Sequence, residues 1–119
     1  TAATLYMSLI GPDGLRRVAV ECHAKTRSLA VAAAEIDGVV PAFRTPHFHE
    51  VVLRLPVSAS AVVEGLRERG ILAGVPLSDW YPELSGCLLV CATETKSDED
   101  IDAYVLALRE QIESTGARR

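Results

Sequence analysis

The chain has 119 residues, a formal net charge of −4, and 49% hydrophobic residues. This length fits a single domain over residues 1–119, and so large an apolar fraction argues against a disordered chain. Arginine and lysine form no cluster larger than a pair and no apolar stretch approaches the roughly 20 residues of a membrane-spanning helix, so neither nucleic acid nor a membrane is an expected partner.

Helical segments are predicted at the start of the chain. Residues 4–10 indicate a short apolar helix or docking arm, and we treat residues 1–12 as an N-terminal arm. Gly11 and Pro12 should break this helix and allow a longer one to begin. Asp37-Gly38 should end the longer helix. Its apolar stripe at three- and four-residue spacing consists of Leu15, Val18, Cys22, Leu29, Ala33 and Ile36.

Strands are predicted at residues 39–43, 50–55, 71–73 and 87–92, and the last is apolar enough to be covered on both faces. A helix capped by Ser58 or Ser60 should end at Gly70. The last helix should begin after Ser97 and fray over residues 113–119. This order predicts an α+β two-layer sandwich with a small sheet of three or four strands. The passage from residue 50 to 92 would be a right-handed crossover if those strands were parallel.

Cysteine and histidine are the first candidates for chemistry. Cys87 and Cys91 would lie about 13 Å apart on one strand face, too far for a shared ion or a disulfide, so they are predicted to be buried, as is Cys22. The odd number of cysteines indicates a reducing compartment, and we expect the cytoplasm. His47 and His49 form the one metal-like pair, which we interpret as structural or solvent-facing.

The two lysines are the residues that could form a Schiff base with a carbonyl compound. Lys25 lies within a helix, and Lys96 comes just before three acidic residues, which favour the charged ammonium. We therefore predict a structural role for both. At the end of the last strand, Thr93 and Glu94 are the polar side chains best placed to reach a ligand or a partner domain.

Several segments, in their order and spacing, resemble the carboxyl-terminal part of subunit 1 of the glycine cleavage system P-protein. The stronger ones are Leu9-Ile10-Gly11, Phe48-His49-Glu50, Gly70-Ile71-Leu72, Tyr81-Pro82 and Leu88-Leu89-Val90-Cys91-Ala92-Thr93-Glu94. His49 stands where we would expect a small amide in many relatives, which adds it to Thr93 and Glu94 as a residue near a site.

The resemblance implies the small carboxyl-terminal domain of a fold-type-I pyridoxal-phosphate enzyme. The whole enzyme would decarboxylate glycine and pass the aminomethyl group to the lipoyl arm of the H-protein. The cofactor lysine would belong to subunit 2, so we expect no cofactor, no metal and no catalytic residue on this chain. Its partners would be the large domain of the same chain, subunit 2 and the lipoylated H-protein. The chain begins at Thr1 without a methionine, and we expect it to be a piece of a longer protein.

Two other functions remain open from the residues. A compact α+β sandwich of this size can be an ACT-like regulatory module that binds an amino acid. A small metal-binding protein that uses His47 and His49 is a weaker alternative.

Overall fold

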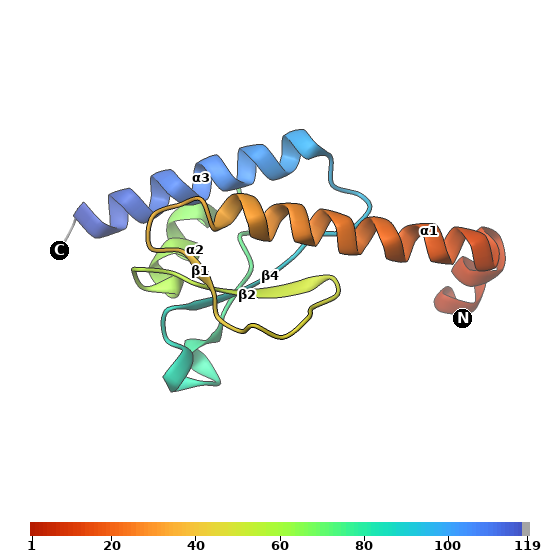
Figure 1. Ribbon diagram of the computed structural model, residues 1–119, viewed down its shortest axis with the longest axis horizontal. Coiled ribbons are helices and arrows are strands. Elements are labelled where there is room, and N and C mark those ends of the chain that lie inside the picture. The colour runs from red at the N-terminus through yellow and green to blue at the C-terminus, as the bar shows by residue number, and fades with distance from the viewer. Residues whose placement is uncertain (118–119) are drawn as a thin grey trace.

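The structure, a computed structural model, describes residues 1–117. Helices α1 and α3 lie side by side over a small sheet, α2 packs against α3, and α1 extends well beyond the sheet (Figure 1). The helices are α1 (Ala2–Ala33), α2 (Ala59–Glu68) and α3 (Asp98–Ala117). The strands are β1 (Val40–Pro41), β2 (Glu50–Arg54), β3 (Val75–Pro76) and β4 (Cys87–Cys91). The predicted α+β sandwich is confirmed.

The sheet has the strand order β1-β2-β4-β3, and every neighbouring pair is antiparallel. β2 and β4 form its centre, in a register that sets Glu50 opposite Cys91 and Arg54 opposite Cys87. Because these two strands are antiparallel, the condition for a right-handed crossover between them is not met. Both edge strands are two residues long and contain a proline, which limits further pairing at the edges.

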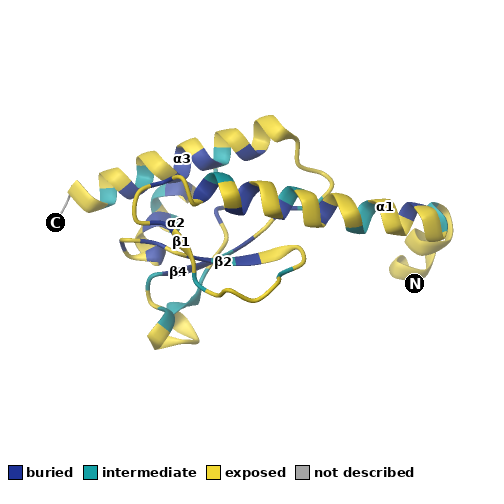
Figure 2. Cartoon of the chain, in the orientation of Figure 1, coloured by how far each residue is buried: buried dark blue, intermediate teal, exposed yellow. Residues whose placement is uncertain are grey.

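The core lies between the sheet and the helices. Val51 and Leu53 of β2 and Leu88 and Val90 of β4 point into it, as the period of two along a strand requires. Figure 2 shows the buried residues concentrated where the helices face the sheet. The opposite face of β4 is only partly covered: Cys87 is buried, but Cys91 is exposed. The predictions that this strand is covered on both faces and that Cys91 is buried are therefore wrong.

Some element boundaries also differ from those predicted. α1 ends at Ala33, because the chain then forms tight turns that lead to Gly38. β1 covers only two residues of the expected strand at 39–43. Residues 71–73 are not a strand, because the two residues after Gly74 pair with β4 instead.

The helix signals in the sequence are confirmed. α1 contains a kink at Gly11, whose φ of 66° is left-handed. Ser58 caps α2, accepting from Ala61 N–H at 3.4 Å. α3 continues to Ala117, so residues 113–117 of the tail predicted to fray are helical here, and residues 118–119 lie outside the described part. The fraying itself stays a prediction. Within residues 1–117, no helix combines the length and the apolar character needed to cross a membrane.

Candidate functional site

The end of β4 and the start of β2 bring the three predicted site-proximal residues to one edge of the sheet. The register of β2 and β4, continued by one residue, sets His49 opposite Ala92, so Thr93 and Glu94 follow at the same edge. The hydroxyl of Thr26, which is fully buried on α1, lies 2.9 Å from the Ala92 carbonyl oxygen and 3.1 Å from that of His49. Sequence reasoning selected these residues separately, and Thr26 is the residue it missed.

Glu94 and Cys22 connect this edge to α1. The Cys22 thiol donates to Oε2 of Glu94 at 3.2 Å, while Glu94 itself is exposed. Burial raises the pKa of the Cys22 thiol, and the hydrogen bond to Glu94 raises it further. Cys22 is therefore a neutral donor that fixes the carboxylate. Nearby, the hydroxyls of Thr93 and Thr95 lie 2.9 Å apart.

Aromatic rings gather beside the same edge. The rings of His23 and His47 lie 6.2 Å apart, and those of Phe48 and His49 lie 5.0 Å apart in an edge-to-face arrangement. Nε2 of His47 is buried without a hydrogen-bond partner among the described residues. Across residues 1–117, no group of three or more His, Cys, Asp or Glu side chains is placed to hold a metal ion. The weaker alternative of a metal-binding protein thus gains no third ligand from this part of the chain.

A cleft of about 600 Å³ opens next to this edge, between the end of β4, the loop 70–75 and the start of α3. Its walls are mainly apolar, and its polar side chains include those of Lys96 and Asp100. The Tyr104 hydroxyl donates to the Ala73 carbonyl at 2.8 Å, and burial raises the pKa of this phenol. Sequence reasoning missed the cleft, because no local motif marks it. The one signal available in the sequence was Tyr104, which lies three residues after Ile101 and therefore on the same face of α3, where both residues line the cleft.

Lys25 and the start of α3 do not fit pyridoxal phosphate. Lys25 Nζ lies 2.6 Å from Oδ1 of Asp98, and this hydrogen bond raises the pKa of the ammonium, the opposite of what a Schiff-base lysine requires. At the start of α3, the N–H of Ser97 donates to Asp100 Oδ2 at 2.9 Å, and the N–H of Asp100 donates to Ser97 Oγ at 3.0 Å. A phosphate at this terminus would meet acidic side chains in place of free donors.

Comparison with known proteins assigns the family. The family model described as "Glycine cleavage system P-protein" matches residues 1–108. A relative from Methylococcus capsulatus, "Probable glycine dehydrogenase (decarboxylating) subunit 1", is 56% identical over 113 residues, which are 95% of this chain and 25% of that protein. A relative of the same description from Nitrosomonas europaea is 50% identical over 112 residues, which are 94% of this chain and 25% of that protein. The chain thus spans about a quarter of the length of these curated relatives.

A solved structure agrees with these sequence relationships. The chain is similar to the "Crystal structure of glycine decarboxylase (P-protein) of the glycine cleavage system, in inhibitor-bound form", with a TM-score of 0.81 and 33% sequence identity. The similarity covers 90% of this chain and 24% of that one. Both the sequence and the fold therefore agree with the resemblance rather than with an ACT-like module. The chain belongs to the glycine cleavage system P-protein family.

Proposed function

We propose that this chain is the carboxyl-terminal domain of a glycine dehydrogenase (decarboxylating) subunit 1. It would support glycine decarboxylation, the oxidoreductase reaction of glycine catabolism that transfers an aminomethyl group to the lipoylated H-protein. The observation that carries this proposal is a family match over residues 1–108 in a chain that spans about a quarter of its relatives.

The division of roles within the enzyme is part of the same proposal. Pyridoxal phosphate would be bound by the rest of the assembled enzyme, because Lys25 is held as an ammonium by Asp98 and the start of α3 is acidic. The partners would be the large domain of the same polypeptide, subunit 2 and the H-protein. We infer the cytoplasm as the location, which the free thiols of Cys22, Cys87 and Cys91 support.

We further propose that the edge formed by His49, Thr93 and Glu94 faces the large domain near the active site. Two contacts from α1 support this proposal. The Thr26 hydroxyl contacts the backbone of both strands at the edge, and the Cys22 thiol donates to the carboxylate of Glu94. Two separate side chains of α1 thus contact this polar edge.

The test of the overall role uses the full-length subunit 1 polypeptide, subunit 2 and lipoylated H-protein. Exchange of labelled bicarbonate into glycine is measured with intact subunit 1, with subunit 1 that lacks this domain, and with the truncated subunit supplemented by the separate domain. We expect exchange to fall to background on truncation. Undiminished exchange by the truncated enzyme would refute the supporting role.

The test of the edge uses Glu94→Gln in the same assay. Glutamine keeps an oxygen that accepts from Cys22 but removes the charge, so folding should be preserved while the electrostatics at the edge change. The matched control is Glu64→Gln on α2, which removes an exposed carboxylate that pairs with Arg67. We expect Glu94→Gln to lower kcat/KM and Glu64→Gln to leave it unchanged. Equal kinetics for the two variants would place this edge away from the site.

A further inference from the structure

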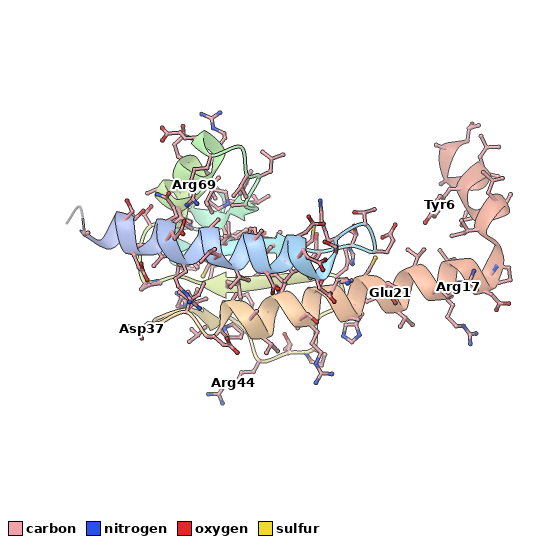
Figure 3. All side chains as sticks on the ribbon, turned by 90° about the horizontal axis from the view of Figure 1, so that it is seen from above. Tyr6, Arg17, Glu21, Asp37, Arg44 and Arg69 are labelled. Carbon is pink, nitrogen blue, oxygen red and sulfur yellow. The ribbon has the colours of Figure 1, made fainter. Side chains whose placement is uncertain are left out.

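The first turns of α1, residues 2–10, form an arm whose composition is unusual for an exposed helix. Residues 1–12 include no charged side chain. Four large apolar residues of the arm are nevertheless exposed, with Leu9 at 85% and Leu5 at 60%. The others are Tyr6 and Met7. In Figure 3 the arm, which carries Tyr6, stands apart from the body of the domain. Contiguous apolar surface of this kind marks a contact site in a soluble protein.

The apolar residues cover one broad side of the arm. At 100° per residue, the polar side chains Thr1, Thr4 and Ser8 share one narrow stripe, and the apolar side chains occupy the rest of the circumference. The Ser8 hydroxyl donates to the Thr4 carbonyl at 2.8 Å, so it has a hydrogen-bond partner within the arm. The arm therefore has a wide side suited to burial and a narrow side suited to water.

The direction of the arm is fixed by the sequence around the kink. Gly11 has φ 66° and ψ 179°, which only glycine adopts without strain, and Pro12 starts the continuing helix. A Cβ at Gly14 would lie 2.9 Å from Cβ of Ile10, so the missing side chain allows the arm to pack closely against the next turn. The arm is thus pre-oriented, which reduces the entropy lost on binding.

Three occupants are conceivable for the apolar side. A lipid surface is disfavoured, because interfacial helices carry cationic side chains and the arm has none. A second copy is disfavoured by the size of the arm. Nine helical residues span only about 14 Å, so one side of the arm is too small to supply the roughly 800 Å² that each partner buries in a stable interface. A contact within one polypeptide needs far less area, because the two surfaces are already linked.

We propose that the apolar side of the arm, residues 2–10, is covered by the remaining part of the same, longer subunit 1 polypeptide. The family match begins at residue 1, so the arm belongs to the family's own region, and the relatives are about four times as long as the aligned segment. This inference rests on the proposed function, because it requires the chain to act as one domain of that longer polypeptide. It adds the surface by which the domain docks.

The experiment uses full-length subunit 1 with single cysteines at Leu9, on the apolar side, and at Ser8, on the polar stripe, as the matched control. Maleimide labelling of each site is followed by peptide mass spectrometry, and Leu5→Cys replaces Leu9→Cys if that variant is insoluble. We expect Leu9→Cys to react at least about tenfold more slowly than Ser8→Cys, as a site that is exposed only by local opening would. Equal rates at both sites would overturn the proposal.

A photoreactive residue at position 9 identifies the occupant. The expected product is a cross-link within one subunit 1 chain, to a peptide outside residues 1–119. A cross-link to a second copy of subunit 1 or to subunit 2 would overturn the assignment. Glycine exchange by the wild-type sample is measured in parallel: absent exchange would refute the proposed function, whereas the labelling ratio and cross-link report the docking surface alone.

Discussion

Thr26 and Ala92 form a reciprocal pair of hydrogen bonds across the interface between α1 and the sheet. The Thr26 hydroxyl donates to the Ala92 carbonyl at 2.9 Å and accepts from the Ala92 N–H at 3.3 Å. The same hydroxyl oxygen lies 3.1 Å from the His49 carbonyl oxygen, so one buried hydroxyl contacts backbone groups where β4 ends and where β2 begins. Thr26 therefore joins α1 to the edge of the sheet that carries His49, Thr93 and Glu94.

Thr26→Val should destabilise the domain more than Thr26→Ser. Valine keeps the shape but leaves the buried N–H and C=O of Ala92 without their partner, which costs about 1–3 kcal/mol. Serine keeps the hydroxyl and loses one methyl group, which costs about 1 kcal/mol. Urea unfolding of both variants measures the difference. A valine variant as stable as the wild type would show that these hydrogen bonds do not hold the edge.

Gly70→Ala and Gly74→Ala should differ, although both glycines have positive φ. At Gly70 (φ 77°) a Cβ would meet no atom within 4 Å, so alanine adds only the left-handed strain of roughly 1–2 kcal/mol. At Gly74 (φ 135°) the Cβ would collide with the backbone oxygen of Leu89. We expect the Gly74 variant to have the lower midpoint in thermal unfolding, and the reverse order would contradict the packing of the loop 70–75 on β4.

The acid stability of the domain should depend on Asp100. Hydrogen bonds from Ser97, chiefly that of its backbone N–H, hold the pKa of Asp100 below its ordinary value. Since the pKa is lower in the folded state, ionised Asp100 stabilises the fold above its unfolded pKa, and this contribution is lost as the pH falls through the folded pKa. Asp100→Asn should therefore reduce the free energy of unfolding at neutral pH, and the difference in this free energy between the variant and the wild type should become smaller in acid. Urea unfolding at several pH values measures this difference, and a difference that does not change with pH would contradict the stabilising role of ionised Asp100.

Much of the fold could be predicted from local patterns. The kink at Gly11, the cap at Ser58, the end of α2 at Gly70 and the start of α3 after Ser97 each depend on one residue with a specific backbone or capping role. The position of β3 could not, because Val75 and Pro76 pair with β4 only after Gly74 approaches the Leu89 carbonyl. That approach is tertiary and has no local signal.

The candidate site was predictable only in part. Thr93 and Glu94 stand out as polar residues that follow an apolar strand, but their proximity to His49 depends on the antiparallel register of β2 and β4. Cys91 was placed wrongly, because an apolar run does not show that only one face of β4 is fully covered. Thr26 gave no signal at all, since a threonine within a helix is more often a surface residue.

We propose that this domain supports glycine decarboxylation without binding the cofactor covalently. It is tested most directly by borohydride reduction of the assembled enzyme with pyridoxal phosphate, followed by peptide mapping of the modified lysine. Because Lys25 is held as an ammonium by Asp98, we expect the pyridoxyl group on a lysine outside residues 1–119. Stoichiometric modification of Lys25 or Lys96 would contradict this proposal.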